Sequence, residues 1–240
     1  MTFRAKMTAL LLRFGLLLCC SGISTQLSTL SSSDSRSDDD PVALFLGTRL
    51  SDNSYASVKA LSLDTVQAVY EYTSDESAKS DFDEITEKAG EKNSWQYSYE
   101  PHVTNLYIGG VIPPNPDDAK LYNSFEEDIK CSVKISAVAY LPGNLIAGIA
   151  FIDLSQLLMS NSFPHTTLLN KGMSAKYSND LIEALNVNEQ FQEDYSNQFI
   201  NAKPIMTYPI TIEGKTYTAY VRKLDKPLLM TGYTHKFYTS

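Results

Sequence analysis

Residues 99–108 read YEPHVTNLYI, and residues 163–169 read FPHTTLL. Each stretch is strand-like and largely apolar, and in each a proline directly precedes a histidine that is followed two positions later by a threonine. Side chains two residues apart on a strand share a face and lie roughly 6–7 Å apart along it. Each stretch therefore predicts a strand that presents an imidazole and a hydroxyl on the same side.

The chain holds three histidines, and His102 and His165 occupy these matched contexts 63 positions apart. One such histidine alone is more often a hydrogen-bonded structural residue, but the recurrence favours a shared site. Histidine exchanges protons near neutral pH, so one imidazole can deprotonate a water while the other protonates a departing oxygen. Thr104 and Thr167 can donate hydrogen bonds to non-bridging phosphate oxygens. These four groups suit phosphodiester hydrolysis, whereas His235 lacks the threonine and is expected at the surface.

The two motifs resemble the signature of the 2H phosphoesterases, whose members include RNA cyclic phosphodiesterases and ligases. The segment 168–181, which runs through a glycine to Ser-Asn, is similar to the cyclic phosphodiesterase domains of fungal-type tRNA ligases and related RNA-repair proteins. Residues 44–47 and 212–217 also look similar. The resemblance extends from about Pro41 to the C-terminus.

The resemblance implies an α+β domain with two lobes, in which antiparallel sheets with outer helices surround a central groove. It also implies that His102 and His165 are the acid/base pair and that Thr104 and Thr167 bind the phosphate. Such an enzyme would open 2′,3′-cyclic phosphates at RNA ends or on nucleotides without a metal or cofactor. A binding module that reads the same ligands without turnover is the main alternative, and a structural protein with incidental motifs is a third.

Two positions depart from the family pattern, since Thr166 replaces an aliphatic residue and Asn105 replaces an apolar one. Neither belongs to the acid/base pair. Lys171, Tyr107 and Tyr177 lie near the motifs in sequence and are candidate substrate contacts, through charge or through stacking on a base. An exposed loop position for the lysine and core packing for the tyrosines are the ordinary alternatives.

The N-terminal residues 1–22 are typical of a secretory signal, because three cations precede an apolar run at 14–20 that is too short to span a bilayer. Cys19 and Cys20 also invite a lipoprotein interpretation, although the residues before them fit it poorly. Residues 23–40 are rich in Ser and Asp and predict a disordered linker, with phosphorylation as a functional alternative. We therefore expect a secreted or lumenal protein without stable membrane insertion after signal cleavage.

Charge restricts the partners. Loss of Arg4, Lys6 and Arg13 with the signal changes the formal net charge from −8 to −11. Nonspecific binding of nucleic acid depends on cations that neutralise phosphates, so we expect an RNA terminus or a small nucleotide rather than a long polyanion, bound by a monomer. No metal-ligand spacing is present, and Cys131, the single cysteine outside the signal, is expected to be a buried strand residue.

Periodicity predicts one α+β domain over residues 41–240. Alternating and apolar runs predict strands besides those of the two motifs, at 42–48, 131–141, 145–154, 205–212 and 215–224. Helical spacing predicts helices at 63–72, 117–129 and 181–185, and a solvated helix or loop at 73–93. Ser178 or Asn179 is expected to cap the helix at 181–185 through its side-chain oxygen.

Overall fold

The computed structural model of the protein describes residues 42–98, 100–152 and 161–238. The predicted signal peptide (1–22) and linker (23–40) lie outside the described residues. The elements follow in the order β1 (Phe45–Leu50), α1 (Asp52–Thr73), α2 (Glu76–Lys88), β2 (Gln96–Tyr97), β3 (His102–Tyr107), α3 (Pro116–Ser124), β4 (Lys130–Leu141), β5 (Leu145–Ile152), β6 (His165–Asn170), α4 (Tyr177–Asn186), α5 (Glu189–Ser196), β7 (Ile205–Ile212) and β8 (Lys215–Phe237).

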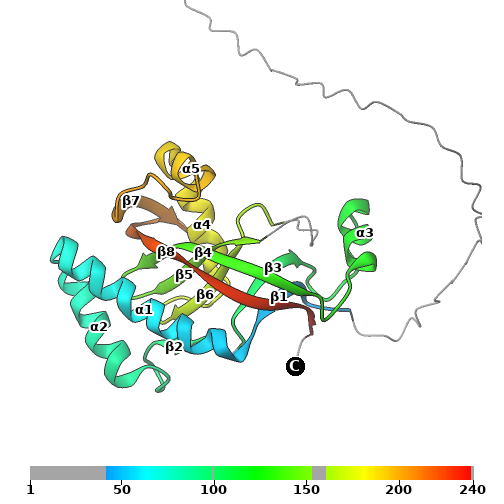
Figure 1. Ribbon diagram of the computed structural model, residues 1–240, viewed down its shortest axis with the longest axis horizontal. Coiled ribbons are helices and arrows are strands. Elements are labelled where there is room, and N and C mark those ends of the chain that lie inside the picture. The colour runs from blue at the N-terminus through cyan, green and yellow to red at the C-terminus, as the bar shows by residue number, and fades with distance from the viewer. Residues whose placement is uncertain (1–41, 99, 153–160, 239–240) are drawn as a thin grey trace, which may run out of the picture. The chain divides into compact units, whose positions relative to one another are not determined.

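The described strands form one eight-stranded sheet, shown in Figure 1, in the order β2-β6-β5-β4-β8-β1-β3, with β7 paired to β8. Each strand pair in it is antiparallel. Strand β8 is 23 residues long, so its first part pairs with β7 and its last part with β1, while β4 runs beside both. The predicted α+β class with antiparallel pairing is confirmed, and the strands are joined in a single sheet.

Helices cover both faces of the central strands. In β4, Tyr140 packs into one core cluster with Val66 of α1 and Ile85 of α2. The neighbouring residue Ala139 points the other way and belongs to a second cluster with Leu181 of α4. Because successive side chains of a strand alternate between faces, the apolar run 137–141 at the end of β4 is buried on both sides.

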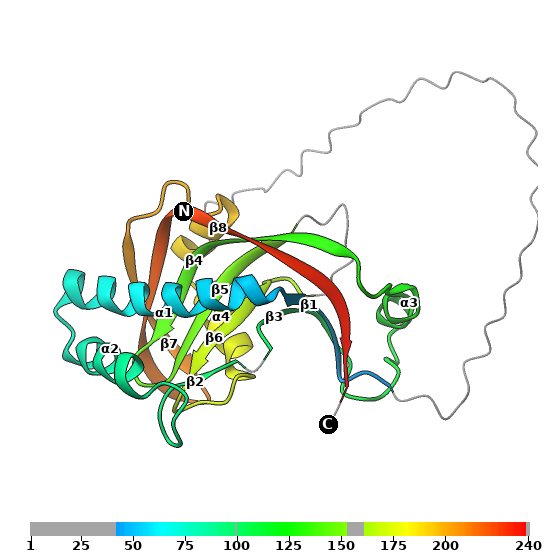
Figure 2. The ribbon, with the colours of Figure 1, turned by 60° about the horizontal axis from the view of Figure 1, so that its bottom comes forward.

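The sheet curves so strongly that its ends meet. Strand β3 is at one end of the strand order and β6 is next to the other end, yet the two strands are in contact. Figure 2 shows the bend of β8, β1 and β3. A backbone hydrogen bond of 3.0 Å from Asn161 N to Asn105 O ties the residues before β6 to β3. The curvature therefore brings together the two strands that carry the histidine motifs.

Most predicted elements are confirmed, with different bounds. Helix α1 begins eleven residues before the predicted 63–72 segment, and β8 continues to Phe237 rather than ending at 224. Helix α3 ends at Ser124, not 129, because Phe125 already has an extended backbone. The segment 73–93 contains helix α2. Cys131 is buried, as expected.

The predicted capping role of Ser178 and Asn179 is wrong. Helix α4 begins at Tyr177, with Lys176 at the N-cap position and no side-chain capping bond. The hydroxyl of Ser178 instead donates to the carbonyl of Ala175, at 2.8 Å. The Ser178 side chain is therefore inside the first helical turn and available to contact strand β6.

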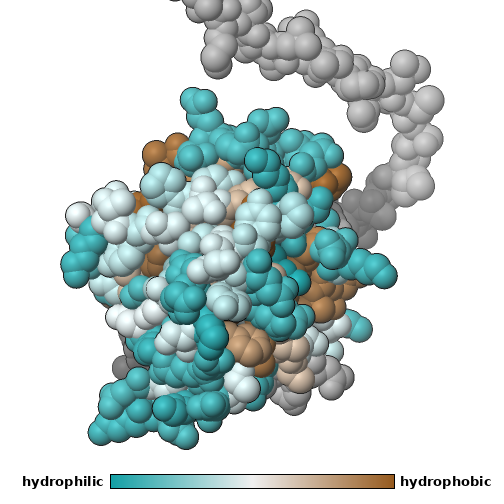
Figure 3. Space-filling model, turned by 90° about the vertical axis from the view of Figure 1, so that its left-hand side faces the viewer, coloured by the Kyte–Doolittle hydropathy of each residue, from teal (hydrophilic) through white to brown (hydrophobic). Residues whose placement is uncertain are grey.

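The side of the molecule seen in Figure 3 is covered mainly by hydrophilic and intermediate residues, and the hydrophobic residues on it form separate patches. Within the described residues, no helix has both the length and the apolar character needed to cross a bilayer.

Candidate active site

Strands β3 and β6 share an irregularity directly after the motif threonine. In the pairing of β3 with β1, Asn105 is an extra residue between Thr104 and Leu106. In the pairing of β6 with β5, Leu168 is likewise an extra residue between Thr167 and Leu169. Such a bulge shifts the alternation of the side chains that follow it. Both strands therefore present their motif side chains on one face and then direct the next apolar residues into the core.

His102 packs against two phenylalanines that stack on each other. Its ring stacks on Phe45 with a centroid separation of 4.7 Å, and the ring of Phe237 lies 4.9 Å away. Nδ1 of His102 is 2.6 Å from the carbonyl oxygen of Glu100. Nε2 has no hydrogen-bond partner among the residues that the structure describes. Burial lowers the pKa of His102, and the bond to Glu100 opposes that effect.

His165 is more enclosed, with 6% of its surface exposed. Its Nδ1 is 2.8 Å from the carbonyl oxygen of Phe163, and its Nε2 is 2.9 Å from Oγ of Ser178. Burial lowers the pKa of His165, and the bond to Phe163 opposes this. The charge of His102 lowers the pKa of His165 further, so the two rings are near enough to interact electrostatically.

The same backbone contact fixes the tautomer of both rings. In each motif, Nδ1 faces the carbonyl oxygen two residues earlier, Glu100 for His102 and Phe163 for His165. A carbonyl oxygen only accepts hydrogen bonds, so Nδ1 must carry a proton. In the neutral ring, Nε2 is then the basic nitrogen. Nε2 is therefore the nitrogen of each neutral ring that can accept a proton.

The motif threonines differ in how their hydroxyls are used. Thr167 Oγ1 donates to Ser178 Oγ at 2.9 Å, with the Ala175 carbonyl at 3.3 Å as a second acceptor. For Thr104, no side-chain hydrogen bond is found within residues 42–98, 100–152 and 161–238. The Thr104 hydroxyl is thus available for a ligand, whereas that of Thr167 is already engaged by protein groups.

Asn161 connects the two motifs. Its side-chain amide donates to the carbonyl of Thr104 at 3.2 Å, and its carbonyl oxygen accepts from the backbone of Phe163 at 3.0 Å. Phe163 in turn supplies the carbonyl that holds His165. Sequence reasoning missed Asn161 and the role of Ser178. An Asn just before a Pro-His-x-Thr strand and a Ser eleven residues after its threonine carry no recognisable signal of their own.

The three predicted substrate contacts have the following surroundings, and their role stays a prediction. Lys171 forms an ion pair with Glu84 of α2. The hydroxyl of Tyr177 donates to Glu213 at 2.8 Å, which raises the pKa of Tyr177. Tyr107 is 68% exposed and lies about 16 Å along the strand from His102.

His235, the third histidine, is in β8 and only partly exposed. Its Nδ1 lies 3.1 Å from a carboxylate oxygen of Glu127. Its ring also contacts the edge of Phe237, with 4.9 Å between centroids. His235 is thus separated from His102 by one aromatic ring and takes no part in a matched carbonyl contact.

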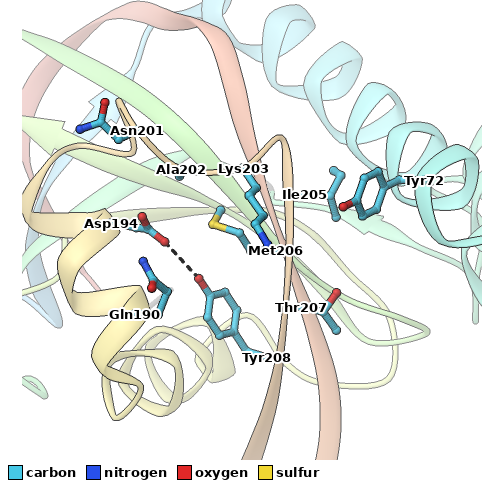
Figure 4. A pocket seen from close by; sticks show the side chains of 10 residues that line it. All are labelled: Tyr72, Gln190, Asp194, Asn201, Ala202, Lys203, Ile205, Met206, Thr207 and Tyr208. Carbon is cyan, nitrogen blue, oxygen red and sulfur yellow. Dashed lines mark hydrogen bonds between the residues drawn. The ribbon is translucent and has the colours of Figure 1, made fainter.

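A cavity of about 470 Å³ lies elsewhere, among α1, α5 and β7. Figure 4 shows Asp194 and Tyr208 pointing toward each other in it. The Tyr208 hydroxyl is 3.5 Å from the buried carboxylate of Asp194. Burial raises the pKa of Tyr208, and the nearby carboxylate raises it further. None of the motif residues lines this cavity. Among the described residues, no group of three or more His, Cys, Asp or Glu side chains is arranged to hold a metal ion.

Comparisons with known proteins do not assign a family. No family model matches the chain, and no curated protein matches it in sequence. Among solved structures, the crystal structure of a fungal RNA kinase is similar, with 17% sequence identity and a TM-score of 0.47. The similarity covers 83% of this chain and 46% of that one, so the chain spans less than half of that structure. A likeness this distant does not assign a function, and membership of the 2H phosphoesterases stays a prediction.

Proposed function

We propose that this chain is a metal-independent phosphodiesterase that hydrolyses 2′,3′-cyclic phosphates at RNA ends or on nucleotides. In this proposal, the domain has the two-lobed arrangement of a 2H phosphoesterase, with β3 in one lobe and β6 in the other. His102 and His165 act as general acid and base, and Thr104 and Thr167 bind the phosphate. The enzyme is secreted or lumenal and acts as a monomer.

The observation that carries the proposal is the matched pair of imidazoles. Both histidines come from strands with the same irregularity, and both are fixed by a carbonyl two residues earlier. Both therefore use Nε2 for proton transfer, and the charge of His102 lowers the pKa of His165. A structural histidine needs no matched second histidine, whereas proton transfer on two sides of one phosphate needs two imidazoles, one to accept a proton and one to donate it.

The reaction follows from the two protonation states. Nε2 of a neutral histidine removes a proton from water as its oxygen bonds to phosphorus. Nε2 of the other histidine, protonated, gives its proton to the ribose oxygen as the bond from that oxygen to phosphorus breaks. The product is a phosphomonoester with a free hydroxyl, and the two histidines have exchanged protonation states. A hydroxyl hydrogen bond to a non-bridging oxygen stabilises the charge that develops there.

The negative charge of the substrate favours the protonated imidazole that the general acid needs, and the proton comes from the solvent. Burial lowers the pKa of both histidines, so the unliganded pair favours the neutral form. A bound phosphodiester carries a negative charge, and a nearby opposite charge favours the imidazolium. We therefore expect one proton to be taken up when the substrate binds. The acidic balance of the rest of the chain disfavours long RNA.

The test uses the protein that remains after residue 40, and also the full chain, in buffer with EDTA. Each is incubated with a 2′,3′-cyclic nucleotide and with a short RNA that ends in a 2′,3′-cyclic phosphate. The proposal expects phosphomonoester product from at least one substrate, loss of product in His102→Ala and in His165→Ala, and retention in His235→Gln.

The outcomes separate the alternatives. Activity that disappears on chelation, or that survives in both histidine variants, contradicts the proposal. Binding of a nonhydrolysable phosphate analogue without turnover of any cyclic substrate indicates the non-catalytic binding module instead. In that case, loss of analogue binding in the threonine variants, with little effect of the histidine variants, would identify the groups that bind.

A further inference from the structure

The Ser178 side chain occupies the proton-transfer nitrogen of His165. It is 3% exposed and comes from the first turn of α4. Its Oγ lies 2.9 Å from His165 Nε2, 2.9 Å from Thr167 Oγ1 and 2.8 Å from the carbonyl oxygen of Ala175. One buried hydroxyl therefore joins the histidine to the threonine of the same motif.

The Ser178 hydroxyl can form a hydrogen bond with His165 in both the neutral and the charged form of the ring. A serine hydroxyl donates one hydrogen bond and accepts two. With neutral His165, Ser178 donates to Nε2 and Thr167 donates to the Ala175 carbonyl, 3.3 Å away. With charged His165, Nε2 donates to Ser178, which turns its proton to Ala175 and accepts from Thr167. Rotation of two hydroxyls satisfies each state, and the heavy atoms stay in place.

We propose that Ser178 is a positioning residue that holds the His165 ring in either protonation state of the unliganded protein and couples that state to the Thr167 hydroxyl. A substrate or water oxygen must take the place of Ser178 at Nε2 before a proton is transferred. The proposal deepens the proposed function and rests on it for the catalytic consequence. The motif of His102 has no such partner among the described residues, so the device belongs to one half of the site.

The direction of the effect follows from hydrogen-bond strength. A bond from a charged donor is roughly twice as strong as one between neutral groups, so Ser178 favours the imidazolium of His165 more than the neutral ring. Burial and the charge of His102 oppose the imidazolium. Within the described residues, His102 on β3 is the titratable side chain whose charge acts on His165. Ser178 on α4 and Ile149, which pairs with His165 from β5, are uncharged.

The test is a titration of both imidazoles by NMR in the wild type, Ser178→Ala, Thr167→Val and the double variant. Ser62→Ala is the matched control, because Ser62 is also buried and donates to a backbone carbonyl in a helix, at 3.0 Å. In Ser178→Ala, we expect the acid dissociation constant of His165 to rise about tenfold, which corresponds to a pKa lower by about one. His102 should change by much less.

The double variant tests the coupling. Because Thr167 reaches His165 through Ser178, Thr167→Val should alter the His165 titration in the wild type and add almost nothing in Ser178→Ala. An unchanged His165 titration in Ser178→Ala, an equal change at His102, or additive effects in the double variant would each overturn the proposal. The titration needs no substrate, so it decides the role of Ser178 even if no cyclic phosphate is hydrolysed.

Discussion

The two motif strands have the same backbone design and different side-chain surroundings. In β3, His102 packs against the stacked rings of Phe45 and Phe237, and its Nε2 has no partner among the described residues. In β6, the corresponding nitrogen of His165 is bonded to Ser178. The backbone therefore determines the tautomer of each histidine, and the surrounding side chains determine how strongly each ring favours its protonated form.

Replacing either histidine should have the largest effect, because it removes one of the two matched imidazoles. General acid/base groups typically contribute about 10²–10⁴-fold, so His102→Ala and His165→Ala should each lower kcat by that order. The double variant should be little worse than the singles, because both groups act in one step. Single-turnover rates on a cyclic nucleotide provide the measurement. A single variant with more than half of wild-type activity would contradict the shared site.

The threonines should sharpen the difference between the halves. The Thr104 hydroxyl has no hydrogen-bond partner in the described part of the chain, whereas Thr167 already donates within the protein. One donor to a developing oxyanion is worth up to about 10²–10³-fold in kcat, so Thr104→Val should approach that loss. Thr167→Val should lose less in kcat and should also alter the pH profile. Equal losses with unchanged profiles would show that the two hydroxyls are equivalent.

Asn161 tests whether the halves must be tied together. Asn161→Ala removes the bonds to Thr104 and Phe163, and a typical hydrogen bond contributes about 1 kcal/mol. We expect a loss of about 2 kcal/mol in the free energy of unfolding, and a lower kcat with both histidines intact. Urea unfolding and kinetics measure these effects. Asn197→Ala is the control, since its amide donates to a carbonyl in its own helix end; equal losses in both would remove the special role of Asn161.

Acidic pH should lower the free energy of unfolding through both histidines, and this effect should be the smallest of those predicted. The pKa of His102 and that of His165 are both lowered in the folded state, so the unfolded chain binds more protons once the pH falls below about 6.5. The stability is fully present above that pH and is lost as the pH falls through the lowered values. Urea unfolding at pH 7.5 and pH 5.5 should show this loss, and the loss should be smaller in His165→Gln. Stability that is flat or rises toward acid would contradict it.

Local sequence patterns predicted much of this fold because the relevant forces are local. Alternation and turn residues gave the β4–β5 hairpin and β7 close to their observed bounds. The spacing of Leu63 and Val69 revealed a helix but not its start. The far half of β8 escaped prediction because Asp225 and Pro227 interrupt its pattern, and only its pairing with β4 and β1 keeps it extended.

Only part of the candidate site could be predicted from the sequence, for a related reason. His102 and His165 were recognisable because a repeated motif is a pattern within the chain. The positions of Ser178 and Asn161 depend on how β3, β6 and α4 meet, and no local pattern encodes that meeting. Lys171 was predicted as a substrate contact from its nearness to the motif in sequence, and its ion pair with Glu84 was not predicted, because Glu84 is far away in the chain.

The extra residue in each motif strand also limits how these strands can change in length. Loss of the codon for Asn105 would make Thr104 and Leu106 adjacent, so these side chains would keep their opposite faces. It would remove the carbonyl that accepts from the backbone of Asn161 and the side-chain oxygen that accepts from Thr48. Loss of Leu168 in β6 would likewise remove the carbonyl that accepts from the backbone of Ser98. We therefore expect evolution to vary side chains freely around both motifs while leaving the number of residues between each histidine and the end of its strand untouched.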